Sequence, residues 1–299
     1  MKSLRYFIAV FSALFVSTPA LSQAIHSVKW ESGVNVRVVK EWSESLNKVS
    51  DASSVTYIKK KSGGRDNLHR VGHRDVIIWI PETTNLSKDF TVIVWFHGHY
   101  GYVPHRTFQD RTLKQFVPLV ADKNFVVVIP EMPWSVHTKT PAKRNSKLWM
   151  KPGQFIRFIE QVELVLIQHW AVQTKSVPIS DLRVGEMDYR VVGHSAGGSA
   201  IRRLGITGDL CKLKPSKIVW SDSSYGEWLD HAWEGCLKDT KIPIEVFVAK
   251  GDSPWRNAKR FMAKFKTPPS NVHVHVMKRP RWSHKLIGNN IVGLSGLLD

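Results

Sequence analysis

The chain has 299 residues, of which 42% are hydrophobic and 23% charged, and its formal net charge is +18. This length fits one large globular domain or two small ones, with enough chain to bury a full core. Beyond residue 24, no uninterrupted apolar run approaches the roughly 18 residues that a membrane span needs, so we expect no transmembrane segment in the mature chain.

The first 24 residues have the pattern of a secretory signal peptide. Lys2 and Arg5 give a positive start, residues 6–16 are apolar, and Ser22-Gln23-Ala24 is a small-x-small cleavage site. A membrane anchor is the alternative, but the apolar run is too short to span a bilayer. We therefore expect cleavage after Ala24 and a secreted or periplasmic protein of residues 25–299.

The strong positive charge constrains the partners. The signal segment holds two basic and no acidic residues, so its removal leaves a net charge of +16. Exported proteins meet few nucleic acids, which favours anionic envelope polymers or lipid headgroups over nucleic acid as partners. A contribution to solubility alone is the alternative.

Short apolar runs alternate with helical patterns along the chain, which predicts a mostly parallel α/β sheet with helices on both faces and a single domain over 25–299. Residues 62–67 are loop by composition, and the basic, aperiodic residues 134–151 are interpreted as a flap over the site. Strands are expected at 34–39, 55–60, 75–81, 90–96, 125–129, 189–192, 217–220, 244–249 and 272–277. Helices are expected at 42–49, 107–123 (kinked or shortened by Pro118), 152–174, 254–266 and 284–298.

The stretch Tyr189 to Gly198 reads YRVVGHSAGG and carries the clearest chemical pattern. Its strand pattern stops at Gly193 and a helical pattern follows, so Ser195 lies in a Gly-x-Ser-x-Gly turn between strand and helix. A serine hydroxyl is a poor nucleophile unless it projects from a tight turn where a base can reach it. The N–H of Ala196 would then point at an oxyanion. A Gly-rich turn with an incidental serine is the other interpretation.

Other polar residues follow predicted strands at the carboxyl edge of the sheet, where groups gather in an open parallel sheet. The run His97-Gly98-His99-Tyr100-Gly101 follows residues 90–96 and can turn the N–H of His99 toward the serine. Asp252 follows 244–249, and His284 follows the last strand. Asp222, after 217–220, is a rival acid to Asp252 and could instead be a helix N-cap.

The order Ser195, Asp252, His284, with the His-Gly turn upstream, resembles the α/β-hydrolase family over about residues 75–299. The resemblance implies that Ser195 attacks an acyl carbonyl, His284 takes and returns its proton, and Asp252 fixes the imidazole tautomer. It also implies an oxyanion hole from the N–H groups of His99 and Ala196. The family often has a run of three glycines where this chain has His99 and Tyr100, which argues against the subclass specialised on esters of tertiary alcohols.

A metal site is not expected. His97, His99 and His105 are close in sequence, but no cysteine or carboxylate nearby completes a tetrahedral set. We predict neither a metal nor a cofactor. In an oxidising compartment Cys211 and Cys236 are candidates for a disulfide, with two buried free thiols as the alternative.

Aromatic and basic residues surround the expected site. Tyr100, Trp134 and Trp282 lie in or beside the loops that would form the pocket mouth, and we predict that they bind substrate. Several basic residues flank His284 and would favour an anionic acyl chain or polymer, with a solvated basic face as the alternative: Lys278, Arg279, Arg281 and Lys285.

Together these features predict an exported serine hydrolase that cleaves carboxylic esters through a covalent acyl-enzyme. Two other hypotheses stay open from the sequence. The same triad could cleave amides or peptides, or the chain could be a non-catalytic binder of anionic envelope polymers. The oligomeric state is not predicted.

Overall fold

The computed structural model of the chain describes residues 27–29, 35–39, 56–62, 65–71, 75–98, 111–130, 132, 151–173, 183–278 and 281–299. The predicted signal peptide, the predicted helix at 42–49 and all but the last residue of the predicted flap at 134–151 lie outside these residues. No helix among the described residues is both long enough and apolar enough to cross a membrane.

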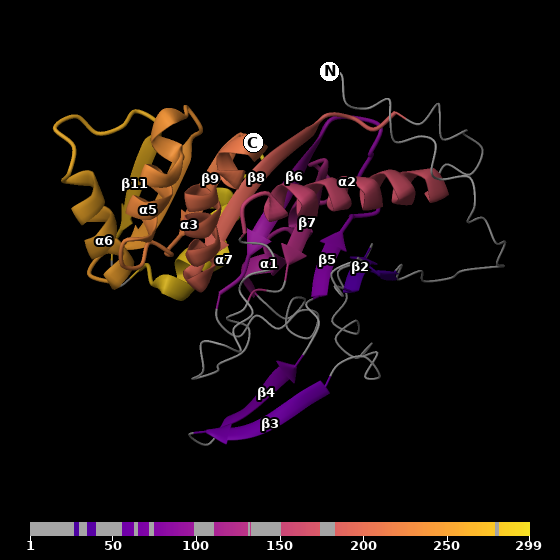
Figure 1. Cartoon of the computed structure of the whole chain (residues 1–299), viewed down its shortest axis with the longest axis horizontal. Coiled ribbons are helices and arrows are strands. Elements are labelled where there is room, and N and C mark those ends of the chain that lie inside the picture. The colour runs from indigo at the N-terminus through magenta and orange to yellow at the C-terminus, as the bar shows by residue number, and fades with distance from the viewer. Residues whose placement is uncertain are drawn as a thin grey trace.

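A nine-stranded sheet organises the described part of the chain, with β11 and β2 toward its opposite ends (Figure 1). The pairs β1–β2 and β5–β7 are antiparallel, and the other neighbours are parallel. In spatial order the strands are β1 (Ser27–Lys29), β2 (Asn35–Val39), β5 (Asp75–Trp79), β7 (Phe125–Pro130), β6 (Phe90–Phe96), β8 (Met187–His194), β9 (Lys217–Ser221), β10 (Ile244–Ala249) and β11 (Val272–Met277).

Helices cover both faces of this sheet, so the central strands are buried on both sides and consist of continuous apolar runs. One core lies under α2, α3, α5 and α6 and includes Phe155, Leu204, Trp233 and Phe261. The other lies under α1 and α7 and includes Ile287. The helices are α1 (Arg111–Lys114), α2 (Gln154–Gln173), α3 (Gly198–Thr207), α4 (Asp209–Leu213), α5 (Trp228–Gly235), α6 (Ser253–Met262) and α7 (His284–Leu294).

The predicted mostly parallel α/β sheet with helices on both faces is confirmed. Pro118 shortens the helix expected at 107–123, as predicted: in the described part of that stretch α1 ends at Lys114 and a 3-10 turn follows at Val117–Leu119. One local prediction is wrong, because the loop expected at 62–67 is mostly strand. β3 (Thr56–Ser62) and β4 (Arg65–Val71) form a hairpin in which Ser62 pairs with Arg65, so only two residues connect the strands.

The two cysteines form a disulfide between α4 and the end of α5, as predicted. Cys211 and Cys236 have Cα atoms 6.2 Å apart and are 25 residues apart in sequence. The loop that the disulfide closes contains β9 and the whole segment that follows it. Candidate residues of the functional site lie on that segment.

Candidate active site

Ser195 lies on a strained turn between β8 and α3. Its φ is +54°, which is uncommon for a residue with a side chain, and a 3-10 turn at Ser195–Gly197 leads into the helix. The flanking glycines leave no room for side chains. A Cβ added to Gly197 would overlap the carbonyl oxygen of Phe96, and one added to Gly193 would lie 2.8 Å from Cδ1 of Ile201. The glycines of the motif therefore permit the close contact of α3 with β6 and β8.

The turn after β6 reaches Ser195 as well. A Cβ added to Gly98 would lie 3.0 Å from Cβ and 3.5 Å from Oγ of Ser195. His97 is buried and fixes this turn: its Nδ1 lies 2.7 Å from the carbonyl oxygen of Gly98, and its Nε2 lies 2.9 Å from the backbone N of Met132. Both bonds fit a neutral imidazole that donates from Nδ1 and accepts at Nε2. The predicted site residues His99, Tyr100 and Trp134 lie outside the described residues.

His284 is hydrogen-bonded to Asp222. Its Nδ1 lies 2.7 Å from Oδ2 of Asp222, a carboxylate that is 1% exposed and whose Oδ1 accepts from the backbone N–H of Ala249 at 3.2 Å. In this geometry Nδ1 carries a proton and donates it to the carboxylate of Asp222. The other ring nitrogen, Nε2, then has a free lone pair and can accept a proton. The acid beside His284 is thus the rival residue Asp222.

Asp252, the acid preferred from the sequence, begins α6 instead. It is the N-cap residue, and its carbonyl oxygen accepts from the N–H of Arg256 at 3.1 Å. The register of the sheet explains the difference. His194 pairs with Ser221, so the next residue along β9, Asp222, leaves the sheet directly beside the turn of Ser195. Asp252 follows β10, one strand farther from β8.

The residue before Ser195 links the turn to His284. The rings of His194 and His284 are stacked, with centroids 4.9 Å apart and planes inclined by 22°. Nδ1 of His194 lies 3.2 Å from both the carbonyl oxygen and the hydroxyl of Ser221. Burial, followed by the charge of His284, lowers the pKa of His194 to about 3, so this ring is uncharged at neutral pH. Ser195 and His284 are therefore brought to the same end of the sheet.

Tyr225 is a further residue at this place that the sequence analysis did not single out. Its ring meets Trp228 edge-on, with centroids 5.4 Å apart. Burial raises the pKa of Tyr225, the nearby hydroxyl of Ser195 offsets part of that rise, and the carboxylates of Asp222 and Asp252 add to it. The only sequence signal was its position three residues beyond Asp222 in the run after β9.

Two other predicted site residues, Ala196 and Trp282, are also among the described residues. Ala196 is buried and follows Ser195 in the 3-10 turn. Trp282 is half-buried and packs against the core beneath α7, two residues before His284. Within the described ranges, no three His, Cys, Asp or Glu side chains are arranged to hold a metal ion.

Comparisons with known proteins find similarity among solved structures. No family model matches the chain, and no curated protein matches it significantly in sequence. Similar solved structures include brefeldin A esterase, described as a bacterial homologue of human hormone-sensitive lipase (TM-score 0.43, 11% identity, 82% of this chain and 73% of that one). Another is a monoglyceride lipase from Saccharomyces cerevisiae, with a TM-score of 0.42 and 9% identity over 82% of this chain and 94% of that one. A third is an α/β serine hydrolase without a lid from Xanthomonas campestris, with a TM-score of 0.40 and 12% identity over 82% of this chain and 91% of that one. The similarity concerns the fold alone. The mostly parallel sheet, with Ser195 in the turn between β8 and α3, has the arrangement expected from the resemblance found in the sequence.

Proposed function

We propose that the chain is a serine hydrolase that cleaves carboxylic esters through a covalent acyl-enzyme. Ser195 is the nucleophile, His284 the general base and acid, and Asp222 the residue that orients the imidazole. One observation carries the proposal: a buried carboxylate holds Nδ1 of His284 at 2.7 Å, and the same imidazole stacks on the residue that precedes a strained serine. A serine, a base and an orienting acid in this order are what acyl transfer requires.

The reaction follows from these roles. Oγ of Ser195 attacks the ester carbonyl carbon while its proton passes to Nε2 of His284, and the carbonyl oxygen becomes an oxyanion. The C–O bond to the alcohol then breaks, and the alcohol leaves with the proton from His284. Water repeats the sequence on the acyl-enzyme and releases the acid. The N–H groups of Ala196 and His99 are the proposed oxyanion donors, and Tyr100, Trp134 and Trp282 the proposed substrate contacts.

We further propose an anionic or polymeric ester as substrate and an exported location. Lys278, Arg281 and Lys285 are exposed close to His284 in sequence, which supports attraction of an anionic substrate. The pattern of residues 1–24 supports export, and sequencing of the N-terminus of the protein recovered from its native host tests it.

The central test is labelling by a fluorophosphonate, with the modified peptide then mapped. We expect an adduct on Ser195 of the folded wild-type protein and no adduct on the Ser195→Ala variant. No adduct would instead favour a non-catalytic binder of anionic polymer. A short panel of p-nitrophenyl esters and p-nitroanilides then separates ester from amide cleavage, and faster turnover of the esters is expected.

A further inference from the structure

The segment between β9 and α5 carries the proposed acid. Asp222 begins this segment with a φ of +44°, a conformation that residues with a side chain adopt rarely and that surrounding contacts must maintain. Two of these contacts come from β10: the backbone N–H of Asp222 donates to Phe247 at 2.8 Å, and its Oδ1 accepts from Ala249 at 3.2 Å. Residues 223–227 belong to no helix or strand, so the path of the chain beyond the acid depends on further contacts.

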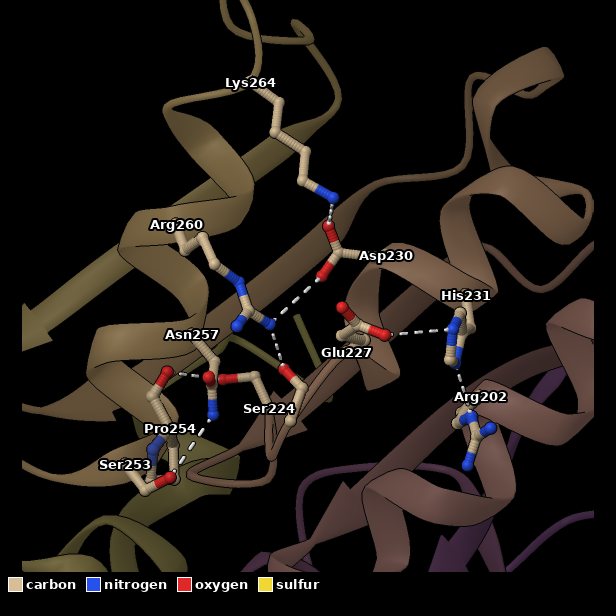
Figure 2. Close-up of polar contacts among 11 residues, drawn as sticks. Arg202, Ser224, Glu227, Asp230, His231, Ser253, Pro254, Asn257, Arg260 and Lys264 are labelled. Atoms are coloured by element: carbon tan, nitrogen blue, oxygen red, sulfur yellow. Dashed lines mark hydrogen bonds and ion pairs between the residues drawn. The ribbon is translucent and has the colours of Figure 1, made fainter.

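Two hydrogen bonds tie this segment to α6. The buried hydroxyl of Ser224 donates to the carbonyl oxygen of Pro254, in the first turn of α6, at 2.9 Å (Figure 2). Further along the segment, the carbonyl oxygen of Gly226 accepts from Nη2 of Arg260 at 2.8 Å. The chain is thus fixed to α6 two and four residues beyond Asp222.

Arg260 is itself held in place by α5, as Figure 2 shows. Its Nη2 lies 3.9 Å from Oδ2 of Asp230, a buried carboxylate in the first turn of α5 that also pairs with Lys264. The guanidinium therefore connects the carbonyl of Gly226 with both α5 and α6. Hydrogen bonds from a charged donor are stronger than those from a neutral one, so this tie is more than an incidental surface contact.

The position of this segment determines how the carboxylate of Asp222 meets His284. Oδ2 of Asp222 lies 2.7 Å from Nδ1 of His284, which belongs to α7 and so to a different element of the fold. A hydrogen bond weakens steeply when its donor and acceptor are misaligned. A shift of the segment would move the carboxylate relative to the imidazole and weaken the bond that orients it.

We propose that Ser224 and Arg260 are positioning residues, which hold the carboxylate of Asp222 at Nδ1 of His284 by fixing the segment to α6. The inference rests on the proposed function, in which Asp222 orients the imidazole. Both residues act through Asp222, so neither has to touch the substrate. A displaced acid slows the proton transfers of the chemical step and leaves substrate binding nearly unchanged, which predicts a loss in kcat and not in KM.

The double variant Ser224→Ala/Arg260→Met tests the proposal, because it removes both ties, and methionine keeps an apolar side chain where the stem of the arginine lay. We expect kcat on a p-nitrophenyl ester to fall by about 10–100-fold with KM changed less than about threefold, since a displacement of about 1 Å can cost 10²-fold. Each single variant should show part of this loss, about fivefold or more, and is judged in the same way if the double variant does not fold.

Lys264→Met is the matched control. Lys264 pairs with the same buried carboxylate, Asp230, but among the described residues it makes no hydrogen bond to the segment 223–227. Its removal should lower the stability of the protein, because the buried carboxylate loses a partner. Its kcat should stay within about threefold of wild type, because both ties of the segment to α6 remain.

Two further readouts separate positioning from a merely structural role. In the Asp222→Asn background, the changes at Ser224 and Arg260 should lower kcat by less than about twofold, because the carboxylate through which they act is already gone. The proton on Nδ1 of His284 gives a low-field NMR resonance, identified by its loss in Asp222→Asn. This resonance should weaken or shift in Ser224→Ala/Arg260→Met and persist in Lys264→Met.

The rates are expressed per Ser195 labelled by fluorophosphonate at saturation, so misfolded protein does not enter the comparison. A kcat of Ser224→Ala/Arg260→Met within about threefold of wild type overturns the inference, and so does a loss confined to KM. An unchanged resonance, or the full loss repeated in the Asp222→Asn background, overturns it as well. All these results leave the proposed function intact, provided that the wild-type protein is labelled at Ser195 and hydrolyses the ester. If the wild-type protein does neither, the proposed function fails, and the inference fails with it.

Discussion

The ring of His194 lies against His284 and Gly288 of α7. It stacks on His284 with centroids 4.9 Å apart, and a Cβ added to Gly288 would overlap its Cε1 and lie 2.8 Å from its Nδ1. His194 is therefore a platform that sets the plane of the imidazole of His284. Because the platform is uncharged at neutral pH, it opposes only weakly the positive charge that His284 would gain from Ser195.

Gly288→Ala should disturb this platform. The added methyl group has no space and would displace the ring of His194, on which His284 stacks, so we expect kcat on esters to fall at least about tenfold and stability to drop by about 1–3 kcal/mol. Gly293→Ala on the same helix is the control, because nothing lies within 4 Å of its Cβ position. It should keep full activity and gain up to about 1 kcal/mol. Ester kinetics and urea unfolding of both variants measure these effects, and equal activities would contradict the platform.

Acid should destabilise the protein through His194. Burial lowers the pKa of His194 to about 3 from its ordinary value of 6.5. Between these values the unfolded state binds a proton at this residue and the folded state does not, so the free energy of unfolding falls as pH falls from about 6.5 toward 3. The loss from this one group is at most about 1.4 kcal/mol per pH unit.

The comparison of wild type with His194→Gln isolates this contribution. Glutamine does not titrate, so the difference between the two unfolding free energies, measured by urea titration from pH 7 to pH 4, should shrink or reverse as the pH falls. A constant offset in stability does not affect the test, because only the slope is compared. Parallel pH profiles would contradict this, because they would mean that the pKa of His194 is the same in the folded and unfolded protein.

The sequence predicted most of the sheet because its central strands are buried on both faces and so are continuous apolar runs. The strands at 90–96, 244–249 and 272–277 have the predicted bounds, and α2 differs from its predicted bounds by two residues at one end and one at the other. β1 was missed because Ser27–Lys29 is too short to show a period. Pro118 shortens the helix expected at 107–123, as its missing backbone N–H predicts.

The site was harder to predict because its contacts depend on lateral register and on loop paths. The serine motif is local, so spacing alone suggested Ser195. The choice between Asp222 and Asp252 depends on which strand end lies beside β8, and the pairing of His194 with Ser221 decides it. Tyr225 escaped notice because the path of its loop is set by Arg260 and Pro254, which are more than 25 residues away.

Removal of the disulfide should lower stability. A cross-link between residues 25 apart restricts the unfolded chain and contributes about 3 kcal/mol by the chain-entropy account. The double variant Cys211→Ser/Cys236→Ser should therefore unfold at a lower urea concentration than wild type, with ester activity retained below the transition. The measurement is urea unfolding with and without a reducing agent. The reductant should shift the wild type to the midpoint of the double variant and leave the variant unchanged; a wild type that does not shift would contradict the bond.

Asp222→Asn should abolish most of the activity, whereas Asp252→Asn should not. Asparagine tolerates the φ of +44° at residue 222, and its carbonyl oxygen can still accept from Ala249. Its amide group would then face Nδ1 of His284 with a donor in place of an acceptor. The imidazole would keep its proton on Nε2, the nitrogen that must accept from Ser195, so kcat should fall about 10⁴-fold with little change in KM.

Asp252→Asn is the matched control, since it makes the same chemical change at the start of α6, where asparagine is as good an N-cap as aspartate. We expect its kcat to stay within about tenfold of wild type. The two variants are compared with wild type on one p-nitrophenyl ester under the same conditions, with kcat and KM measured separately. A larger loss in Asp252→Asn than in Asp222→Asn would return the role of the acid to Asp252 and would mean that His284 changes partner when substrate binds.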